Sequence, residues 1–296
     1  MMETISTAIR LLAKRPSILV LAITLSIILC VVENLFMTLF YGITMFRTGS
    51  PFDDYINIIQ FLIDTVFVPQ TAVRIILALV IFVLVAALIL ALMLSGCFNI
   101  LINAVEGRAK KERNEFLEGV RKYFFRMISV NLWTISAFVL FCIYVVIATI
   151  PAAIFIDNAF SGAVNIVAGI LIFIITIAVL FFSYAFFRQY IAFWYPAAFV
   201  YNKNHFKIAK KISDNNFWTL LSKFIIFDIL IILFDALYVV ATFSLAGAQS
   251  MSGAASSILL IVNIIFKTIF IALLVCFVFS SFKSCSDKSQ FKKAGA

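Results

Sequence analysis

The chain has 296 residues, of which 64% are hydrophobic and 12% are charged, and its formal net charge is +9. Soluble globular domains hold about 45–50% apolar and about 25% charged residues, so this composition excludes an ordinary soluble domain. A basic chain can attract anionic lipid or nucleic acid. Here the charges are spread along segments beside long apolar runs, so we expect no nucleic-acid partner.

Six apolar runs are long enough to cross a bilayer, for which about 20 residues suffice. Lipid offers backbone groups no hydrogen bonds, and no run alternates as a barrel strand does, so we expect six helices. Prolines support the boundaries: Pro16 and Pro69 precede the first two runs, and Pro151 and Pro196 follow the third and fourth. The runs cover residues 17–45, 72–104, 127–150, 164–194, 217–243 and 257–282.

The segment between the first two runs has a pattern of its own. Apolar residues recur at helical spacing from Tyr55 to Val66, with Asp53 and Asp54 just before them and Asp64 among them. This spacing predicts a short external helix of about 14 residues at the membrane interface. A re-entrant or lid segment is the alternative.

Lysine and arginine lie on one side of the six runs. They precede the first run, lie between the second and third, surround the junction of the fourth and fifth, and follow the sixth. The loops of the other side offer Arg47 and Arg74 only. The positive-inside rule therefore predicts a protein of the cell membrane with both termini in the cytoplasm. We expect the basic residues to face anionic lipid headgroups.

Short basic segments lead into the first, third and fifth runs. They align when Pro16, Met127 and Phe217 are set as equivalent, and Asn114 then matches Asn204. A basic amphipathic helix at a cytoplasmic boundary is expected to lie in the headgroup plane. It can serve as scaffold, as a lipid sensor or as a docking site for a partner. The three leads are residues 5–15, 114–126 and 204–216.

The leads divide the chain into similar parts. Ala8, Gly119 and Ala209 coincide in the same alignment, which favours related units. We therefore expect an all-α integral membrane protein with one membrane domain. It is built of three amphipathic-helix-plus-hairpin units, residues 1–104, 105–201 and 202–283, and residues 284–296 form a short basic cytoplasmic tail.

The chain also resembles known families. A basic amphipathic segment, a Phe or Trp at the start of the apolar run and a long hairpin occur from Asn114 to Trp133 and from Asn204 to Phe224. This pattern resembles the YciC-like and glycerophosphoryl diester phosphodiesterase membrane-domain families and covers most of the chain. The resemblance implies a six-helix prokaryotic membrane module. It implies no phosphodiesterase activity, because no catalytic domain of that type accompanies the runs.

Charged residues inside the apolar runs form the candidate site. A charge at a helix centre costs about 2.5–3.5 kcal/mol on insertion scales, so such residues are expected to face the interior and pair. Counting about 1.5 Å per residue predicts a buried pair between Asp228 and Lys267, with Asn263 adjoining. Glu33 and Asp235 are expected nearer the outer side, where they share a proton, a water pocket or a cation.

This polar cluster has two interpretations, an ion or proton relay or polar-substrate site, and a neutralised pair that fixes helix register. His205 is the single histidine, and no phosphate loop, HExxH motif, nucleophile elbow or paired metal ligands occur. We therefore expect no enzyme, no cofactor and no metal.

Three functions stay open. The first is a non-enzymatic module that organises lipid, a membrane-protein partner or a second copy of the chain. The second is a transporter or channel subunit that uses the intramembrane charges. The third is an immunity or resistance protein of the membrane.

Overall fold

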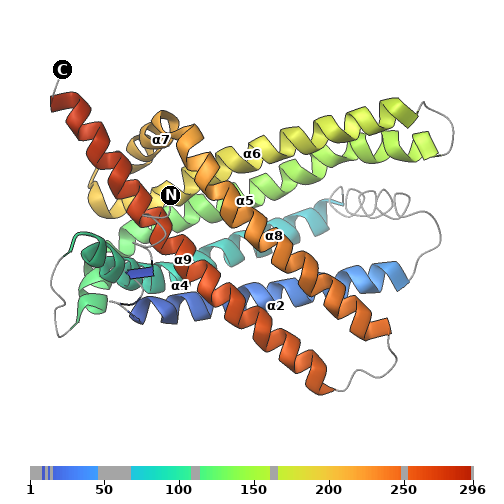
Figure 1. Cartoon of the computed structure of the whole chain (residues 1–296), viewed down its shortest axis with the longest axis horizontal. Coiled ribbons are helices and arrows are strands. Elements are labelled where there is room, and N and C mark those ends of the chain that lie inside the picture. The colour runs from blue at the N-terminus through green and yellow to red at the C-terminus, as the bar shows by residue number, and fades with distance from the viewer. Residues whose placement is uncertain are drawn as a thin grey trace. The chain divides into compact units, whose positions relative to one another are not determined.

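A computed structural model describes residues 9–10, 13, 16–45, 68–107, 114–160, 166–247 and 253–294. Within these ranges the chain is all-helical, as predicted, with seven helices and no strand (Figure 1). The predicted external helix of residues 53–66 and most of the first lead lie outside the described residues. The helices are α2 (Ser17–Met45), α4 (Pro69–Val105), α5 (Glu115–Phe160), α6 (Ile166–Val200), α7 (His205–Asn215), α8 (Phe217–Gly247) and α9 (Gly253–Ala294).

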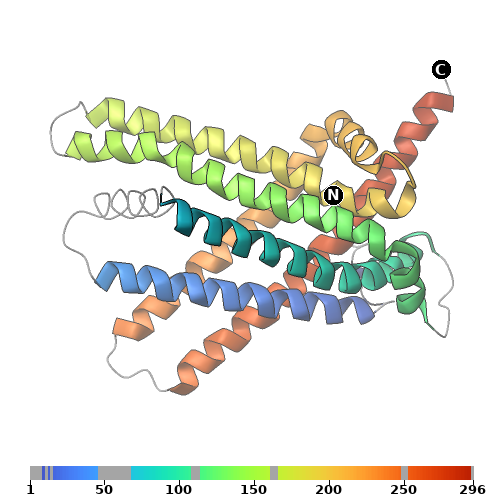
Figure 2. The ribbon, with the colours of Figure 1, turned by 180° about the vertical axis from the view of Figure 1, so that it is seen from behind.

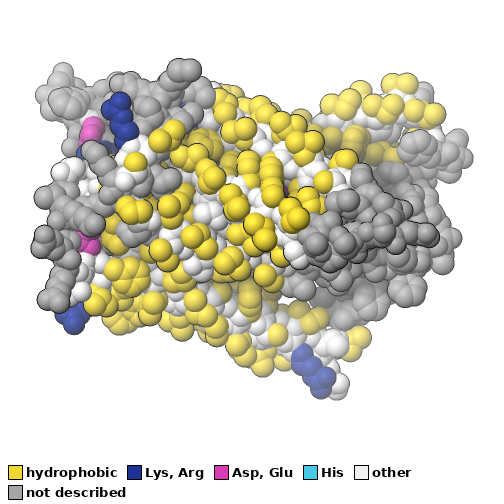
Figure 3. Space-filling view, turned by 60° about the horizontal axis from the view of Figure 1, so that its bottom comes forward, with side chains coloured by type: hydrophobic (Ala, Val, Ile, Leu, Met, Phe, Trp, Pro, Cys, Tyr) yellow, Lys and Arg dark blue, Asp and Glu magenta, His cyan; other side chains and the backbone are white. Residues whose placement is uncertain are grey.

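The described helices are those of a membrane protein with several spans. Five are long and apolar enough to cross a membrane, and α2 holds a shorter apolar stretch, Ile18–Val31, among its described side chains. Hydrophobic side chains cover most of the described surface on the face seen in Figure 3, with few charges among them. The five candidate spans are Pro69–Val105, Glu115–Ile156, Ile166–Val200, Phe217–Thr242 and Ser257–Asp287.

Two prolines mark helix starts as predicted, and two do not mark helix ends. Pro16 lies just before α2, and Pro69 is the first residue of α4. Pro151 and Pro196 were expected to end their helices, but they lie inside α5 and α6. Apolar spans tolerate an interior proline because neighbouring groups and local adjustments satisfy the freed carbonyl.

The second and third leads differ in structure. The second lead was expected to be a separate helix in the headgroup plane, but it continues directly into the span, so that α5 is 46 residues long. The third lead is a separate helix, α7, which contacts α8 and α9. The third lead ends in Asp214, Asn215 and Asn216, which are weak helix formers, whereas the second lead ends in Phe125 and Arg126.

The two leads nevertheless begin in the same way. Asn114 and Asn204, which the alignment matched, have φ values of 73° and 55°, and no other non-glycine residue of the described ranges has a positive φ. Asparagine tolerates this left-handed conformation better than most residues. The carbonyl of Asn114 accepts a hydrogen bond from the Glu118 N–H at 2.9 Å, and that of Asn204 accepts one from Ile208 at 3.0 Å.

The chain divides into two compact units, whose boundaries fall within α2, α4, α5 and α6. The larger comprises residues 1–35, 91–127 and 189–296. In its core α2 packs on α9 through Ala22 and Ala272. Phe98 of α4 contacts Phe199 of α6 and Phe279 of α9, with ring centroids 6.2 and 4.8 Å apart. Aromatic packing therefore joins three helices of this unit.

The smaller unit comprises residues 36–90 and 128–188. Its parts of α5 and α6 lie side by side (Figures 1 and 2), and the Tyr144 and Ser183 hydroxyls are 3.0 Å apart between them. The buried Asn131 amide donates to the Ala87 carbonyl of α4 at 3.2 Å. Polar contacts between apolar helices thus set the register of this unit.

Candidate functional site

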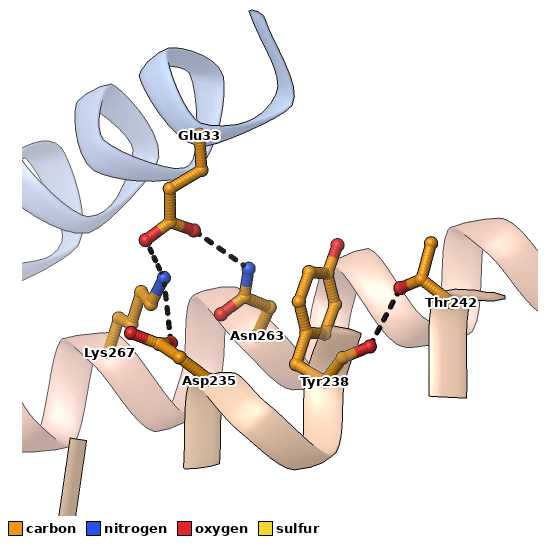
Figure 4. A network of polar contacts seen from close by, with 6 residues as sticks. All are labelled: Glu33, Asp235, Tyr238, Thr242, Asn263 and Lys267. Carbon is orange, nitrogen blue, oxygen red and sulfur yellow. Dashed lines mark hydrogen bonds and ion pairs between the residues drawn. The ribbon is translucent and has the colours of Figure 1, made fainter. Parts of the chain in front are cut away.

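A polar cluster lies among three apolar helices of the larger unit (Figure 4). Glu33 comes from α2, Asp235 from α8, and Asn263 and Lys267 from α9. Asn263 and Lys267 are four residues apart, so the helix places both on one face, as the sequence predicts. The structure therefore brings four of the five candidate site residues together.

Lys267 is the centre of this cluster. Its side chain is only 3% exposed, and its ammonium donates a hydrogen bond to Glu33 Oε1. The same nitrogen lies 3.3 Å from Asp235 Oδ1. The Glu33 and Asp235 side chains are 36% and 41% exposed. One buried cation thus joins two partly exposed carboxylates from different helices.

Asn263 completes the cluster from the same face as Lys267. It is 1% exposed, and its Nδ2 donates to Glu33 Oε2 at 3.4 Å. Its Oδ1 is buried and accepts no hydrogen bond, and Asp235 Oδ1 is likewise buried without one, despite its nearby ammonium. Buried polar atoms of this kind are rare in native proteins and call for an explanation.

The predicted partner of Lys267 was wrong. The sequence predicted a pair of Lys267 with Asp228, whereas in the structure Lys267 pairs with Glu33 and Asp235. Asp235 is twelve residues before Gly247, the end of α8, and Lys267 is fourteen after Gly253, the start of α9. At about 1.5 Å per residue these distances are about 18 and 21 Å, whereas Asp228 is about 28 Å from Gly247.

Aromatic rings border the cluster on the hairpin of α8 and α9. Phe234, next to Asp235, stacks on Phe266, next to Lys267, with ring centroids 3.6 Å apart. Cys30, one turn before Glu33 on α2, lies close enough to interact electrostatically with the three charged residues. These apolar neighbours lower the local dielectric and strengthen every charge interaction within the cluster.

Two basic residues have a role that the sequence analysis missed. Arg126 donates to the Ala198 carbonyl at 2.6 Å and to Asn202 Oδ1 at 2.9 Å, and Lys283 donates to the Val105 carbonyl at 2.9 Å. These carbonyls belong to the last turns of α6 and α4, whose acceptors lack partners within the helix. Both residues were counted among the lipid-facing charges, yet they cap helix ends.

A second polar region lies close to the helix ends that Arg126 and Lys283 cap. A cavity of about 390 Å³ is lined by Glu106, Glu115, Glu118, Lys122 and Asn202, among other residues. The named residues come from the turn that follows α4, from α5, and from the segment between α6 and α7. Periodicity could not find this cavity, because its residues are scattered along the chain and become neighbours only through helix packing.

The single histidine lies close to the Arg126 cap. Burial, and second the positive charge of Arg126, lower the pKa of His205 below its usual value. His205 Nε2 is buried without a hydrogen-bond partner. Neither the burial of this nitrogen nor the contact of His205 with Phe206 has a signal in the sequence.

These features define the class of the protein, a helical multi-pass membrane protein with a charged cluster inside its apolar helices. Within the described residues no group of three or more His, Cys, Asp or Glu side chains could hold a metal ion. No protein-family model, curated protein or solved structure matches the chain. The resemblance to the YciC-like and phosphodiesterase membrane-domain families therefore stays a prediction.

Proposed function

We propose that the chain is a non-enzymatic module of the cell membrane that gathers anionic lipid at its cytoplasmic face. In this proposal α2 is the sixth span, both termini are cytoplasmic, and the three hairpin units form one membrane domain. The observation that carries the lipid proposal is the position of α7, which docks on the protein by one face and presents lysines on the other.

The docked face of α7 is small and apolar. Its buried residues are Ala209, Ile212 and Ser213, and the Tyr190 hydroxyl of α6 donates to the Asp214 carboxylate at 2.5 Å. Because α7 packs on α8 and α9, its apolar face is used within the protein. The helix is thus held in place independently of lipid.

The opposite face of α7 carries positive charge. Its exposed lysines are Lys207, Lys210 and Lys211. Trp218, three residues beyond the end of α7, is 70% exposed, as expected of a ring at the membrane–water interface. A lysine near an anionic surface contributes about 1 kcal/mol. Three lysines together therefore favour anionic over neutral lipid roughly a hundredfold before salt screening.

The experiment measures lipid selectivity. The full chain is reconstituted with mixed anionic and zwitterionic lipid, and the lipid retained on the purified protein is quantified by native mass spectrometry. The triple variant Lys207→Gln/Lys210→Gln/Lys211→Gln should lose the enrichment of anionic lipid, whereas the matched triple Lys→Arg variant should keep it. Equal enrichment in the glutamine variant and the native chain contradicts the proposal.

A transporter or channel subunit is the second candidate. It is favoured by one observation, that the two carboxylates beside Lys267 are more than a third exposed. Intramembrane charges of this kind often mark ion or substrate pathways. Ion flux into proteoliposomes that is present with the native chain and absent with Asp235→Asn supports this candidate. Equal flux in both, or none in the native chain, removes it.

A further inference from the structure

We propose that the polar cluster is a binding site for one proton, which is bound by Asp235 and hydrogen-bonded to the amide oxygen of Asn263. This inference does not depend on lipid selectivity or on transport. It concerns only what the cluster binds, and its ligand is the smallest cation.

The charges of the cluster do not balance. The cluster joins one ammonium, on Lys267, to two carboxylates, on Glu33 and Asp235, so its formal charge is −1 when all three are ionised. An uncompensated charge among apolar helices is strongly unfavourable, and such groups are neutralised instead. One added positive charge makes the cluster neutral.

Asp235 is the carboxylate that takes this added charge. Glu33 already accepts hydrogen bonds at both oxygens, from Lys267 at Oε1 and from Asn263 at Oε2. Asp235 Oδ1, in contrast, lies 3.3 Å from the Lys267 ammonium in an ion pair but is buried and accepts no hydrogen bond. Of the two carboxylates, Asp235 is therefore the one whose hydrogen bonding is incomplete.

Asn263 is oriented to accept a hydrogen bond from a protonated Asp235. Because its Nδ2 donates to Glu33, its Oδ1 lies on the other side of the amide, toward Asp235 (Figure 4). Asn263 is 1% exposed, and its Oδ1 accepts a hydrogen bond from no donor. Two buried acceptors cannot bond each other. A proton on the Asp235 carboxylate converts it to a carboxylic acid, whose O–H donates to Asn263 Oδ1 and leaves no acceptor unmatched.

The groups around the cluster favour a proton over an alkali ion. They are Glu33 and Cys30 on α2, Asp235 and Tyr238 on α8, and Asn263 and Lys267 on α9. A metal cation would lie beside the Lys267 ammonium and be repelled by it, and it would need several oxygen ligands. A proton needs no cavity, and one carboxylate and one amide oxygen are enough to hold it.

Infrared difference spectroscopy tests the proposal on the full chain in lipid nanodiscs. At neutral pH the native chain should show the C=O band of a protonated carboxyl group. The band should be absent from Asp235→Asn, which keeps the size and neutrality of the acid. It should persist in the matched control Asp228→Asn, on the same helix. In Asn263→Leu, which removes the acceptor, the band should move to higher frequency.

Other results overturn the proposal. No protonated-carboxyl band in the native chain at neutral pH shows that the cluster holds no proton. A rise in melting temperature with sodium but not with choline, in a native chain without the band, assigns an alkali ion instead. If Asp235→Asn fails to fold, isotope labelling of the native chain decides. A band that shifts with ¹³C-aspartate supports the proposal, and one that shifts with ¹³C-glutamate contradicts it.

Discussion

Replacing Lys267 with glutamine removes the cation that joins α2 to the hairpin of α8 and α9. The Glu33 carboxylate, which accepts a hydrogen bond from Lys267, then has no counter-charge. For two unit charges about 4 Å apart, an effective dielectric constant of about 20 gives an attraction of about 4 kcal/mol. Removal of one partner from a buried ion pair costs about 3–5 kcal/mol. Since the Glu33 side chain is 36% exposed, we expect a loss near the lower value, about 3 kcal/mol.

The assay is reversible unfolding of the full chain in bicelles, which gives the free energy of unfolding of each variant. The double variant Lys267→Gln/Glu33→Gln should regain at least half of the loss, because it removes the unpaired charge of Glu33. Lys210→Gln, at an exposed lysine of α7, is the matched control and should stay within about 0.5 kcal/mol of the native chain. A double variant no more stable than Lys267→Gln alone refutes the electrostatic reasoning.

Three further predictions concern the larger unit. A Cβ at Gly119 would lie 2.5 Å from the Cβ of Asn99, so Gly119→Val should lose about 1–3 kcal/mol in the same unfolding assay. Because Asn204 has a φ of 55°, Asn204→Ala should cost about 1–2 kcal/mol and Asn204→Gly much less; equal losses contradict this. Burial, and second Arg126, lower the pKa of His205, so its stabilising effect is present above about pH 6.5 and is lost as the pH falls through the lower folded-state value. Arg126→Gln should raise that pKa in an NMR titration, and an unchanged or lower value contradicts the assigned cause.

The membrane-protein class and the helix positions follow from the sequence. In lipid, the backbone of an apolar run must satisfy its own hydrogen bonds, and an α-helix does so within one segment. The predicted first run, residues 17–45, has the bounds of α2. The ends of α5 and α6 were harder to predict. Proline ends most helices in water, but Pro151 and Pro196 lie within helices that continue.

The repeat was informative at its polar positions. The match of Asn114 with Asn204 came from sequence alignment alone, and both residues adopt the left-handed conformation. Whether each lead forms a helix separate from the span after it depends on the helix propensity of the last residues of the lead. The Asp-Asn-Asn end of the third lead breaks the helix, and the Phe-Arg end of the second does not.

The site was found from the sequence, but its pairing was not. Rare charges within the apolar runs gave five candidate residues, and four of them, Lys267, Asn263, Glu33 and Asp235, meet in the structure, whereas Asp228 does not join them. Which carboxylate faces Lys267 depends on where the α8–α9 hairpin ends, and the helices extend further than the apolar runs. The packing of α2 against α9 is a long-range contact with no local signal.

The central claim is that six helices cross the membrane and leave both termini in the cytoplasm, and the parity of the spans tests it directly. In intact cells, an impermeant thiol reagent is applied to versions of the full chain that carry one cysteine each, at Cys285, at Ser250→Cys or in a tag ahead of Met1. The account predicts that Ser250→Cys reacts from outside, and that Cys285 and the tag react only after the cells are opened. Labelling of the tag and Cys285 from opposite sides requires an odd number of spans and contradicts the account.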